Sequence, residues 1–203
     1  MILDAEVCSY EQLLEAAQEA VAGGVDIIQL RDKKGTAQDI LGFSRRIKKI
    51  VKRKIPYIIN DRVDLAKAAG ASGVHLGQDD LSVRFARKEL GADAIIGVSC
   101  QNLQQAFKAQ QDSADYIGFG SVFKTLTKPD RSPMDLKILA DVIKKIQIPV
   151  FAIGGIGIRN LELLKSLGVK RAAICREILK AKDIKATTQV LKNISPPDKL
   201  LVS

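Results

Sequence analysis

Short runs rich in Val and Ile recur along the whole chain, and longer stretches with helical spacing of apolar residues separate them. The runs cover residues 25–30, 55–59, 73–76, 94–98, 116–119, 148–153 and 171–175. They are apolar without strict alternation, which is typical of strands buried on both faces of a parallel sheet. The segments 10–22, 40–51, 63–69, 103–109, 136–145 and 160–167 have the periodicity of crossover helices.

Seven such alternations without a linker predict an α/β fold, and their number favours a (β/α)₈ TIM barrel. The eighth strand has to come from Met1 to Leu3, so we expect a short or truncated first strand. The competing topology is a doubly wound open sheet, which normally has a glycine-rich phosphate motif after its first strand, and this sequence has none there. A length of 203 residues predicts one domain, 1–203, with a poorly ordered C-terminal tail over 193–203.

Composition narrows the classes of function. The chain has 32 Lys and Arg against 23 Asp and Glu, a surplus that fits nucleic acid, an anionic membrane surface or small phosphorylated substrates. No apolar run approaches the roughly 18 residues of a membrane helix, and the acidic N-terminus is unlike a signal peptide, so we expect a cytoplasmic protein. Three scattered cysteines and one histidine argue against a zinc or disulfide framework, and a Ser-His-Asp triad could use only His75.

Charged and amide side chains follow the second, third and fourth predicted strands, where active residues of such barrels gather. Those after the second strand alternate onto one side: Gln29, Arg31 and Lys33. Asp61 follows the third strand, and Asp79 and Asp80 follow the fourth. Two carboxylates from neighbouring strand ends can share Mg²⁺ when a substrate diphosphate completes its shell. The alternative is that these carboxylates cap the helices that follow them.

Hydroxyls and glycines follow the later strands. Ser99 ends the fifth strand, and the long polar loop after the sixth contains Thr125, Thr127 and Lys128. The glycines within 154–157 expose backbone amides at a helix N-terminus, which suits a phosphate. The loops after strands seven and eight form the usual phosphate site of such barrels. Glycines also serve turns for conformational reasons, so this motif alone does not decide between the two roles.

The strand-end motifs together carry a family resemblance. They are QLRDK at 29–33, INDR at 59–62, VHLGQDD at 74–80, GVS at 97–99, TLTK at 125–128 and IGGI at 153–156. In this order and spacing, from about residue 4 to about residue 185, they resemble the thiamine phosphate synthase family. The resemblance implies a transferase on a (β/α)₈ barrel that uses Mg²⁺. It joins an aminopyrimidine-methyl diphosphate to a thiazole-ethyl phosphate, plain or carboxylated, through a pyrimidine-methyl cation formed when diphosphate leaves.

The resemblance also implies roles for particular residues. Gln29 would hold the pyrimidine, and Ser99 would lie near the pyrimidine and the diphosphate. The residues implied to hold the diphosphate are Arg31, Lys33, Asn60 and Lys128, and the Mg²⁺ ligands are Asp61 and Asp80. Thr125 and Thr127 would lie beside the thiazole phosphate and the joining point. The backbone amides implied to bind that phosphate are those of Gly155, Cys175 and Arg176.

Among these residues, four are expected to act in catalysis itself: Lys128, Arg31, Ser99 and Thr127. The sequence also departs from the family pattern. Asp135 stands where a glycine is common before a helix, and we expect it to cap that helix.

Two alternatives remain open. A thiazole tautomerase of the same fold needs neither diphosphate nor Mg²⁺, and the joint presence of Asp61, Asp80, Thr127 and Lys128 argues against it. A basic nucleic-acid-binding protein would explain the charge and the run 48–54, but aromatic residues are only 4% of the chain, which leaves few stacking surfaces. We therefore expect small phosphorylated substrates as partners, with no nucleic acid and no membrane, and a homo-oligomer stays open.

Overall fold

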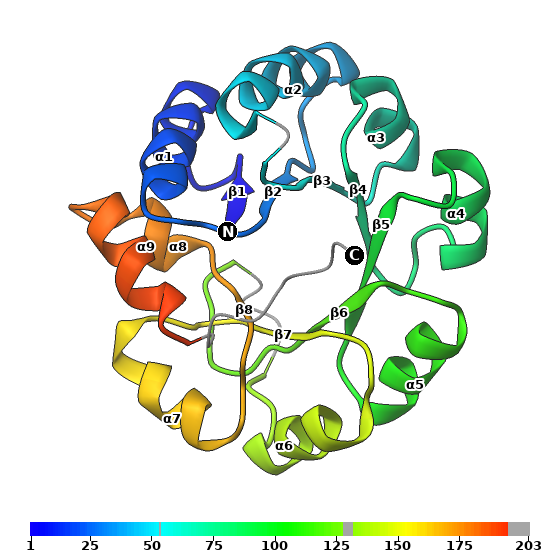
Figure 1. Ribbon diagram of the computed structural model, residues 1–203, viewed down its shortest axis with the longest axis vertical. Coiled ribbons are helices and arrows are strands. Elements are labelled where there is room, and N and C mark those ends of the chain that lie inside the picture. The colour runs from blue at the N-terminus through cyan, green and yellow to red at the C-terminus, as the bar shows by residue number, and fades with distance from the viewer. Residues whose placement is uncertain (53, 128–131, 195–203) are drawn as a thin grey trace.

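A ring of parallel strands forms the centre of the molecule, with helices around it (Figure 1). The computed structural model describes residues 1–52, 54–127 and 132–194. The strands are β1 (Ile2–Asp4), β2 (Ile28–Arg31), β3 (Tyr57–Asn60), β4 (Gly73–Leu76), β5 (Ile95–Cys100), β6 (Tyr116–Phe119), β7 (Val150–Ile153) and β8 (Ala172–Ala173). Each strand pairs in parallel with the next. The Ile2 N–H donates to the Ile174 carbonyl at 2.8 Å, which joins the two ends of the sheet. The predicted TIM barrel is confirmed.

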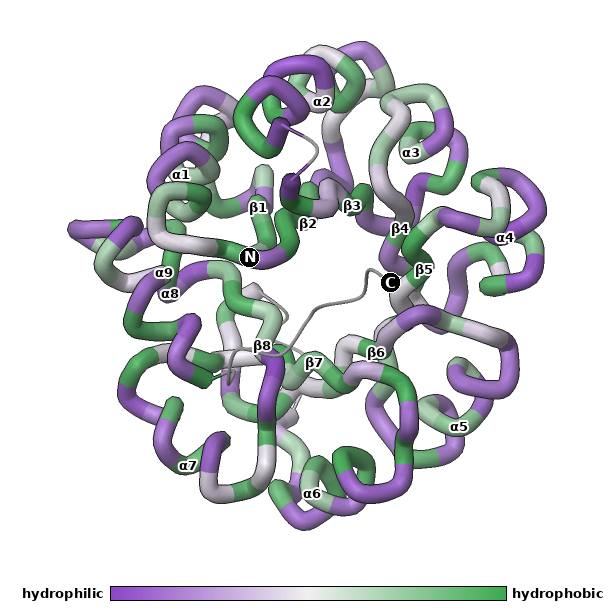
Figure 2. The backbone as a smooth tube through the Cα atoms, in the orientation of Figure 1, coloured by the Kyte–Doolittle hydropathy of each residue, from purple (hydrophilic) through white to green (hydrophobic). Residues whose placement is uncertain are grey.

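The helices form the outer ring in Figure 1. They are α1 (Tyr10–Ala22), α2 (Ala37–Val51), α3 (Val63–Ala69), α4 (Val83–Leu90), α5 (Leu103–Gln111), α6 (Leu136–Lys145), α7 (Leu161–Ser166, after the short 3-10 helix η1, Ile158–Asn160), α8 (Arg176–Leu179) and α9 (Ile184–Lys192). In Figure 2 hydrophobic and hydrophilic positions alternate around these helices, as expected for helices with one apolar face. No described helix is long and apolar enough to cross a membrane.

Capping side chains mark several helix starts. Ser9 and Gln12 form a reciprocal capping box at α1, in which each side chain accepts a hydrogen bond from the backbone of the other. The Asp135 carboxylate accepts from the Lys137 N–H at 2.8 Å, so the expected cap of α6 is confirmed. These local signals explain why both helices have the bounds that the sequence predicts.

The first strand is short, as expected, and it is buried throughout. Its three residues include Asp4, whose backbone pairs with Arg31 of β2. Strand β8 is shorter than the predicted run 171–175, and α4 is a helix that the periodicity did not single out, because only Val83 and Ala86 of it are buried. The predicted C-terminal tail lies outside the described residues from position 195 onward.

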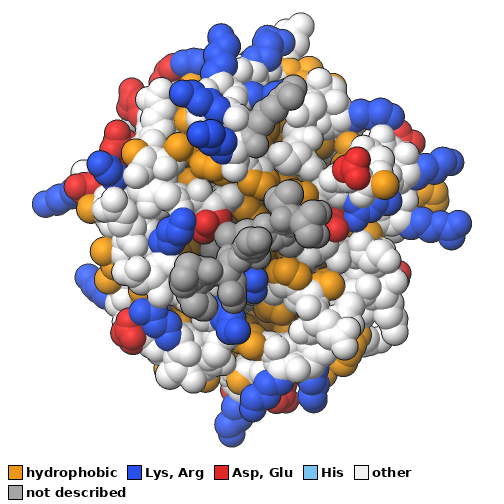
Figure 3. Space-filling model, viewed as in Figure 1, with side chains coloured by type: hydrophobic (Ala, Val, Ile, Leu, Met, Phe, Trp, Pro, Cys, Tyr) orange, Lys and Arg blue, Asp and Glu red, His pale blue; other side chains and the backbone are white. Residues whose placement is uncertain are grey.

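The surface charge is spread over the helices. On the face seen in Figure 3, Lys and Arg side chains lie around the periphery with Asp and Glu among them. Several form exposed ion pairs between neighbouring helices, such as Arg46 with Glu11 and Lys67 with Glu89. Exposed pairs of this kind contribute little to stability.

Candidate active site

A cavity of about 290 Å³ opens at the carboxyl ends of the strands. Nine of the residues predicted from the sequence line it: Gln29, Arg31, Asn60, Ser99, Thr125, Thr127, Gly155, Cys175 and Arg176. They come from β2, β3 and β5 and from the segments after β6, β7 and β8. A separate cluster lies after β2, β3 and β4. It consists of Lys33, Asp61 and Asp80, which do not line the cavity. Lys128 lies outside the described residues.

Asp61 and Asp80 do not cap the helices that follow them. The cap position of α3 is Arg62, with no capping side chain, and α4 is capped by the Ser82 hydroxyl. Asp80 Oδ2 instead accepts from the Gly77 N–H at 2.6 Å, within its own loop. Asp61 has a φ of +62°, an uncommon conformation for a residue with a side chain that is found at functional sites. The capping alternative is therefore wrong for both carboxylates.

These two carboxylates fit a divalent cation. Partial burial raises the pKa of the Asp80 carboxyl, and the neighbouring Asp61 raises it further. Lys33 forms an ion pair with Asp61. Mg²⁺ accepts such a set, because it usually binds one or two carboxylates and completes its shell with water and phosphate oxygens. Among the residues the structure describes, no cluster of three His, Cys, Asp or Glu side chains is placed to hold a metal.

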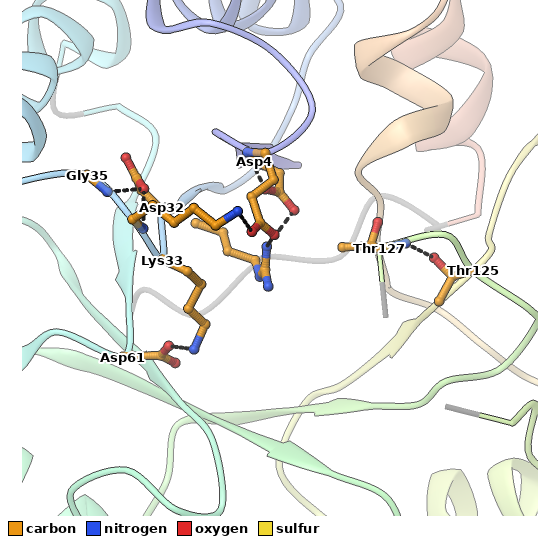
Figure 4. A network of polar contacts seen from close by, with 10 residues as sticks. Asp4, Asp32, Lys33, Gly35, Asp61, Thr125 and Thr127 are labelled. Atoms are coloured by element: carbon orange, nitrogen blue, oxygen red, sulfur yellow. Dashed lines mark hydrogen bonds and ion pairs between the residues drawn. The ribbon is translucent and has the colours of Figure 1, made fainter. Parts of the chain in front are cut away.

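The loop after β2 is shaped by Asp32, a residue that lies between two predicted diphosphate ligands. Asp32 Oδ1 accepts from the N–H groups of Lys34 and Gly35, at 2.9 and 2.7 Å, and Oδ2 accepts from the Tyr10 hydroxyl at 2.5 Å. Figure 4 shows this loop with Lys33 extending from it toward Asp61. Asp32 thus holds the backbone that presents the Lys33 ammonium.

A chain of polar side chains crosses the barrel interior below the cavity. His75 Nε2 is hydrogen-bonded to Ser99 Oγ at 2.9 Å, and Nδ1 is hydrogen-bonded to the Tyr116 hydroxyl at 3.0 Å. Burial raises the pKa of Tyr116, against the opposing effect of a hydrogen bond from Gln29. The chain thus connects Gln29 with Ser99, both predicted beside the pyrimidine. A Ser-His-Asp triad would need a carboxylate at the position of Tyr116, so Ser99, His75 and Tyr116 do not form one.

His75 and Tyr116 are residues to which the sequence reasoning assigned no role in the site. Each is a buried polar side chain in a short apolar strand, and such a side chain needs a hydrogen-bond partner. His75 also lines the cavity, whereas the Tyr116 ring lies deeper in the barrel. The sequence signal that could have found them is a single polar residue within each of the apolar runs 73–76 and 116–119.

The opposite side of the cavity is built from backbone. Gly154 and Gly155 have φ of +103° and +63°, and a Cβ on Gly155 would lie 2.4 Å from the Lys124 carbonyl oxygen. The Asn160 side chain fixes this loop, because its Nδ2 donates to the Gly155 carbonyl and its Oδ1 accepts from the Gly157 N–H. A glycine at position 155 is therefore required for both the conformation and the packing of the loop.

Arg176 lies beside this glycine loop with an unmatched donor. Its Nε is buried and has no hydrogen-bond partner among the described residues. Arg176 also lines the cavity and begins α8. Since a buried N–H group is costly without an acceptor, this atom fits an anionic ligand held at the same end of the cavity as the exposed glycine amides.

The chain is similar to proteins of known activity over almost its whole length. The model of a family described as thiamine monophosphate synthase matches residues 1–178. A thiamine-phosphate synthase of Ruminiclostridium cellulolyticum is 40% identical over 195 residues, which cover 96% of this chain and 93% of that one. Another, of Halalkalibacterium halodurans, is 44% identical over 87% of this chain and 85% of its own length. The solved structure of a thiamine phosphate pyrophosphorylase from Pyrococcus furiosus superimposes with a TM-score of 0.85 at 30% identity, covering 95% and 93% of the two chains.

Proposed function

The chain belongs to the thiamine monophosphate synthase family and is an enzyme that makes thiamine phosphate, and we propose how its residues divide that reaction. The substrates are 4-amino-2-methyl-5-(diphosphooxymethyl)pyrimidine and 4-methyl-5-(2-phosphooxyethyl)thiazole or its carboxylated form. One observation supports this division: nine predicted residues line a single cavity, and the neighbouring carboxylates Asp61 and Asp80 lie after β3 and β4.

The β2 to β5 side of the cavity would take the pyrimidine diphosphate. Gln29 holds the pyrimidine, with Ser99 nearby, and the groups on the diphosphate are Arg31, Lys33, Asn60 and Lys128. The support is positional: Gln29, Arg31, Asn60 and Ser99 line the cavity, and Lys33 extends from the loop after β2. The guanidinium of Arg31 and the ammonium groups of Lys33 and Lys128 would match the charge and the oxygen geometry of a diphosphate.

Asp61 and Asp80 would hold Mg²⁺. When bound, Mg²⁺ would neutralise charge that develops on the departing diphosphate. The closeness of the two carboxylates supports this assignment, because a cation between them would relieve the interaction with Asp61 that, after partial burial, raises the pKa of Asp80.

The β6 to β8 side would take the thiazole phosphate. The amides of Gly155, Cys175 and Arg176 bind the phosphate, and the buried Arg176 Nε adds a further donor. Thr125 and Thr127 lie beside the joining point. The Thr127 N–H donates to Thr125 Oγ1 at 3.3 Å, so this part of the loop has a hydrogen bond of its own.

The reaction then needs charge neutralisation and alignment more than proton transfer. The diphosphate leaves first, and the thiazole nitrogen attacks the resulting pyrimidine-methyl cation with its own lone pair, so no general base is required. Arg31, Lys33 and Lys128 stabilise the leaving group, while Ser99 and Thr127 keep the two substrates in line. The thiol of Cys175 stays neutral in this scheme, because burial raises its pKa to about 12.

The direct test mixes both substrates with Mg²⁺ and measures thiamine phosphate and released diphosphate, with and without a chelator. We expect equal amounts of the two products and their loss on chelation. Isomerised thiazole phosphate as the only product would favour a tautomerase. Activity that survives a chelator would remove Asp61 and Asp80 from the scheme as metal ligands.

We also propose that the enzyme acts in the cytoplasm as one domain spanning 1–203, without binding nucleic acid. Fractionation of cells tests the location, and limited proteolysis that yields a stable smaller fragment would contradict the single domain. Retention of the protein on DNA or RNA at physiological ionic strength would contradict the absence of nucleic-acid binding.

A further inference from the structure

Two carboxylates of very different exposure hold the Arg31 guanidinium. Arg31 Nη1 donates to Asp4 Oδ2 at 2.9 Å and to Glu6 Oε2 at 3.0 Å. The Asp4 side chain is 1% exposed, whereas that of Glu6 is 37% exposed. Both bonds leave from the same nitrogen, so the two carboxylates occupy the two N–H groups of Nη1.

Asp4 is fixed in place by the barrel itself. It ends β1, where its backbone pairs with that of Arg31, and the Ala5 N–H donates to the Arg31 carbonyl at 3.0 Å. Its second carboxylate oxygen, Oδ1, accepts from the Glu6 N–H at 3.0 Å. A buried carboxylate without a cationic partner is strongly unfavourable, so Asp4 and Arg31 have to stay together.

Glu6 is attached far more loosely. Its other oxygen lies 3.3 Å from the ammonium of Lys34, whose side chain is 81% exposed. Hydrogen bonds from Arg31 and Lys34 lower the pKa of Glu6, so the side chain is an anion at neutral pH. Exposed ion pairs are weak. A diphosphate offers several anionic oxygens and binds a guanidinium through two parallel hydrogen bonds, so it competes well for the place that Glu6 holds.

We propose that Asp4 is a positioning residue that holds the Arg31 guanidinium at the cavity, and that Glu6 is an exchangeable carboxylate that leaves Arg31 when the substrate diphosphate binds. This deepens the proposed function and rests on its assignment of Arg31 to the diphosphate. Figure 4 shows Asp4 on the same side of the mouth as Lys33 and Asp61, across from Thr125 and Thr127. The exchange therefore acts on the pyrimidine substrate alone.

Asp4→Asn and Glu6→Gln remove the same unit of charge, and the proposal gives them opposite effects. The probe is inorganic diphosphate with Mg²⁺, measured by calorimetry on the full chain and as an inhibitor competing with the pyrimidine diphosphate. Glu6→Gln removes a competitor, so diphosphate should bind about two- to fivefold more tightly. Asp4→Asn loosens Arg31, so diphosphate should bind roughly tenfold more weakly.

The substrate constants separate a positioning role from a structural one. In Asp4→Asn we expect a higher KM for the pyrimidine diphosphate and an unchanged KM for the thiazole phosphate. The matched control is Glu11→Gln, which breaks the exposed pair with Arg46 on the outer helices and should change neither constant. Tighter binding of diphosphate to both Asp4→Asn and Glu6→Gln would overturn the proposal, because only the charge would then matter.

A second arm works even where Asp4→Asn fails to fold. In an Arg31→Lys background the guanidinium is gone, so Glu6→Gln should no longer improve diphosphate binding. The same improvement in both backgrounds would overturn the exchange. The assignment of Arg31 is tested separately by Arg31→Gln: if that variant binds inorganic diphosphate as tightly as the unaltered chain, the proposed function of Arg31 fails, whatever Glu6 does.

Discussion

The two sides of the barrel mouth offer different kinds of groups to an anion. After β1 to β4 the site is made of ionised side chains, and each of its described cations has a carboxylate partner: Arg31 has Asp4 and Glu6, and Lys33 has Asp61. After β7 and β8 it is made of glycine amides held by Asn160, with the charged residues Arg176 and Glu177 at the start of α8. Figure 4 shows residues of the first side facing Thr125 and Thr127 across the opening.

The difference matches the two phosphorylated groups. A diphosphate that has to leave carries its charge away, and ionised side chains that already have counter-ions can release it and pair again. A phosphate that stays attached to the thiazole needs only a rigid binding site, and backbone amides provide one without a flexible side chain. Variants of the proposed Mg²⁺ ligands should therefore change turnover, and variants of the glycine loop should change the binding of one substrate.

The largest effect should come from Asp61→Ala on the side-chain side. This variant removes a proposed Mg²⁺ ligand and the partner of Lys33, so we expect kcat to fall by about 10²–10³-fold at saturating Mg²⁺ and substrates. Asp79→Ala is the control, since it removes an exposed carboxylate next to Asp80 and should change kcat less than about threefold. Normal turnover of Asp61→Ala would take Asp61 out of the mechanism.

Gly155→Ala should disrupt the glycine loop that is proposed to bind the thiazole phosphate. An L side chain at a φ of +63° is strained, and its Cβ would meet the Lys124 carbonyl oxygen, so we expect KM for the thiazole phosphate to rise about tenfold or more. KM for the pyrimidine diphosphate should stay the same. Steady-state kinetics with each substrate varied in turn checks this.

The control is Gly168→Ala, which has a φ of +81° but an open neighbourhood, with the nearest atom at 3.9 Å. It should lower the thermal midpoint by a few degrees without changing either KM. If both glycine variants lose thiazole binding equally, the effect is a general loss of stability. The phosphate would then not bind at Gly155.

Tyr116→Phe should affect the polar chain that joins Gln29 to Ser99 on the side-chain side. It removes the hydroxyl bonded to His75, so we expect a loss of about 1–3 kcal/mol in the free energy of unfolding, with a rise of a few fold in KM for the pyrimidine diphosphate. Tyr57→Phe is matched to it, because that buried hydroxyl is bonded to Ser44 in the outer layer. Tyr57→Phe should lose stability alone, and a KM change of equal size in both variants would contradict the role of the interior chain.

Local signals explain which parts of the fold could be predicted. Helices α1, α3 and α6 and strands β4 and β6 have the bounds expected from their apolar spacing, and glycine or capping residues stand at several of these ends. Helix α4 was not singled out because it buries few residues. Strand β2 extends to Arg31, one residue past the apolar run, where its backbone pairs with that of Asp4 in β1.

The candidate site also has a part that could be predicted from local sequence and a part that could not. Residues on the strands, such as Gln29 and Ser99, could be predicted to line the cavity because their place depends only on the strand that carries them. The bonds between Asp4 and Arg31 and between His75 and Tyr116 join residues 27 and 41 positions apart, and no local pattern encodes them. The sequence therefore predicts the side chains that line the cavity better than the side chains that hold them in place.

The smallest effect concerns pH, to which the side-chain side should be more sensitive than the amide side. Burial pushes the pKa of Asp32 up, but hydrogen bonds from Tyr10, Lys34 and Gly35 outweigh it and the pKa is lowered. A lowered folded-state pKa gives stability that is complete above the unfolded value of about 3.9 and is lost as pH falls through the folded value. Urea unfolding should show Asp32→Asn less stable by about 1 kcal/mol at pH 7, with the gap closing below about pH 4. Asp141→Asn, in an exposed pair 4.0 Å from Lys145, should show no such gap, and a gap for Asp32→Asn that widens in acid would contradict the assignment.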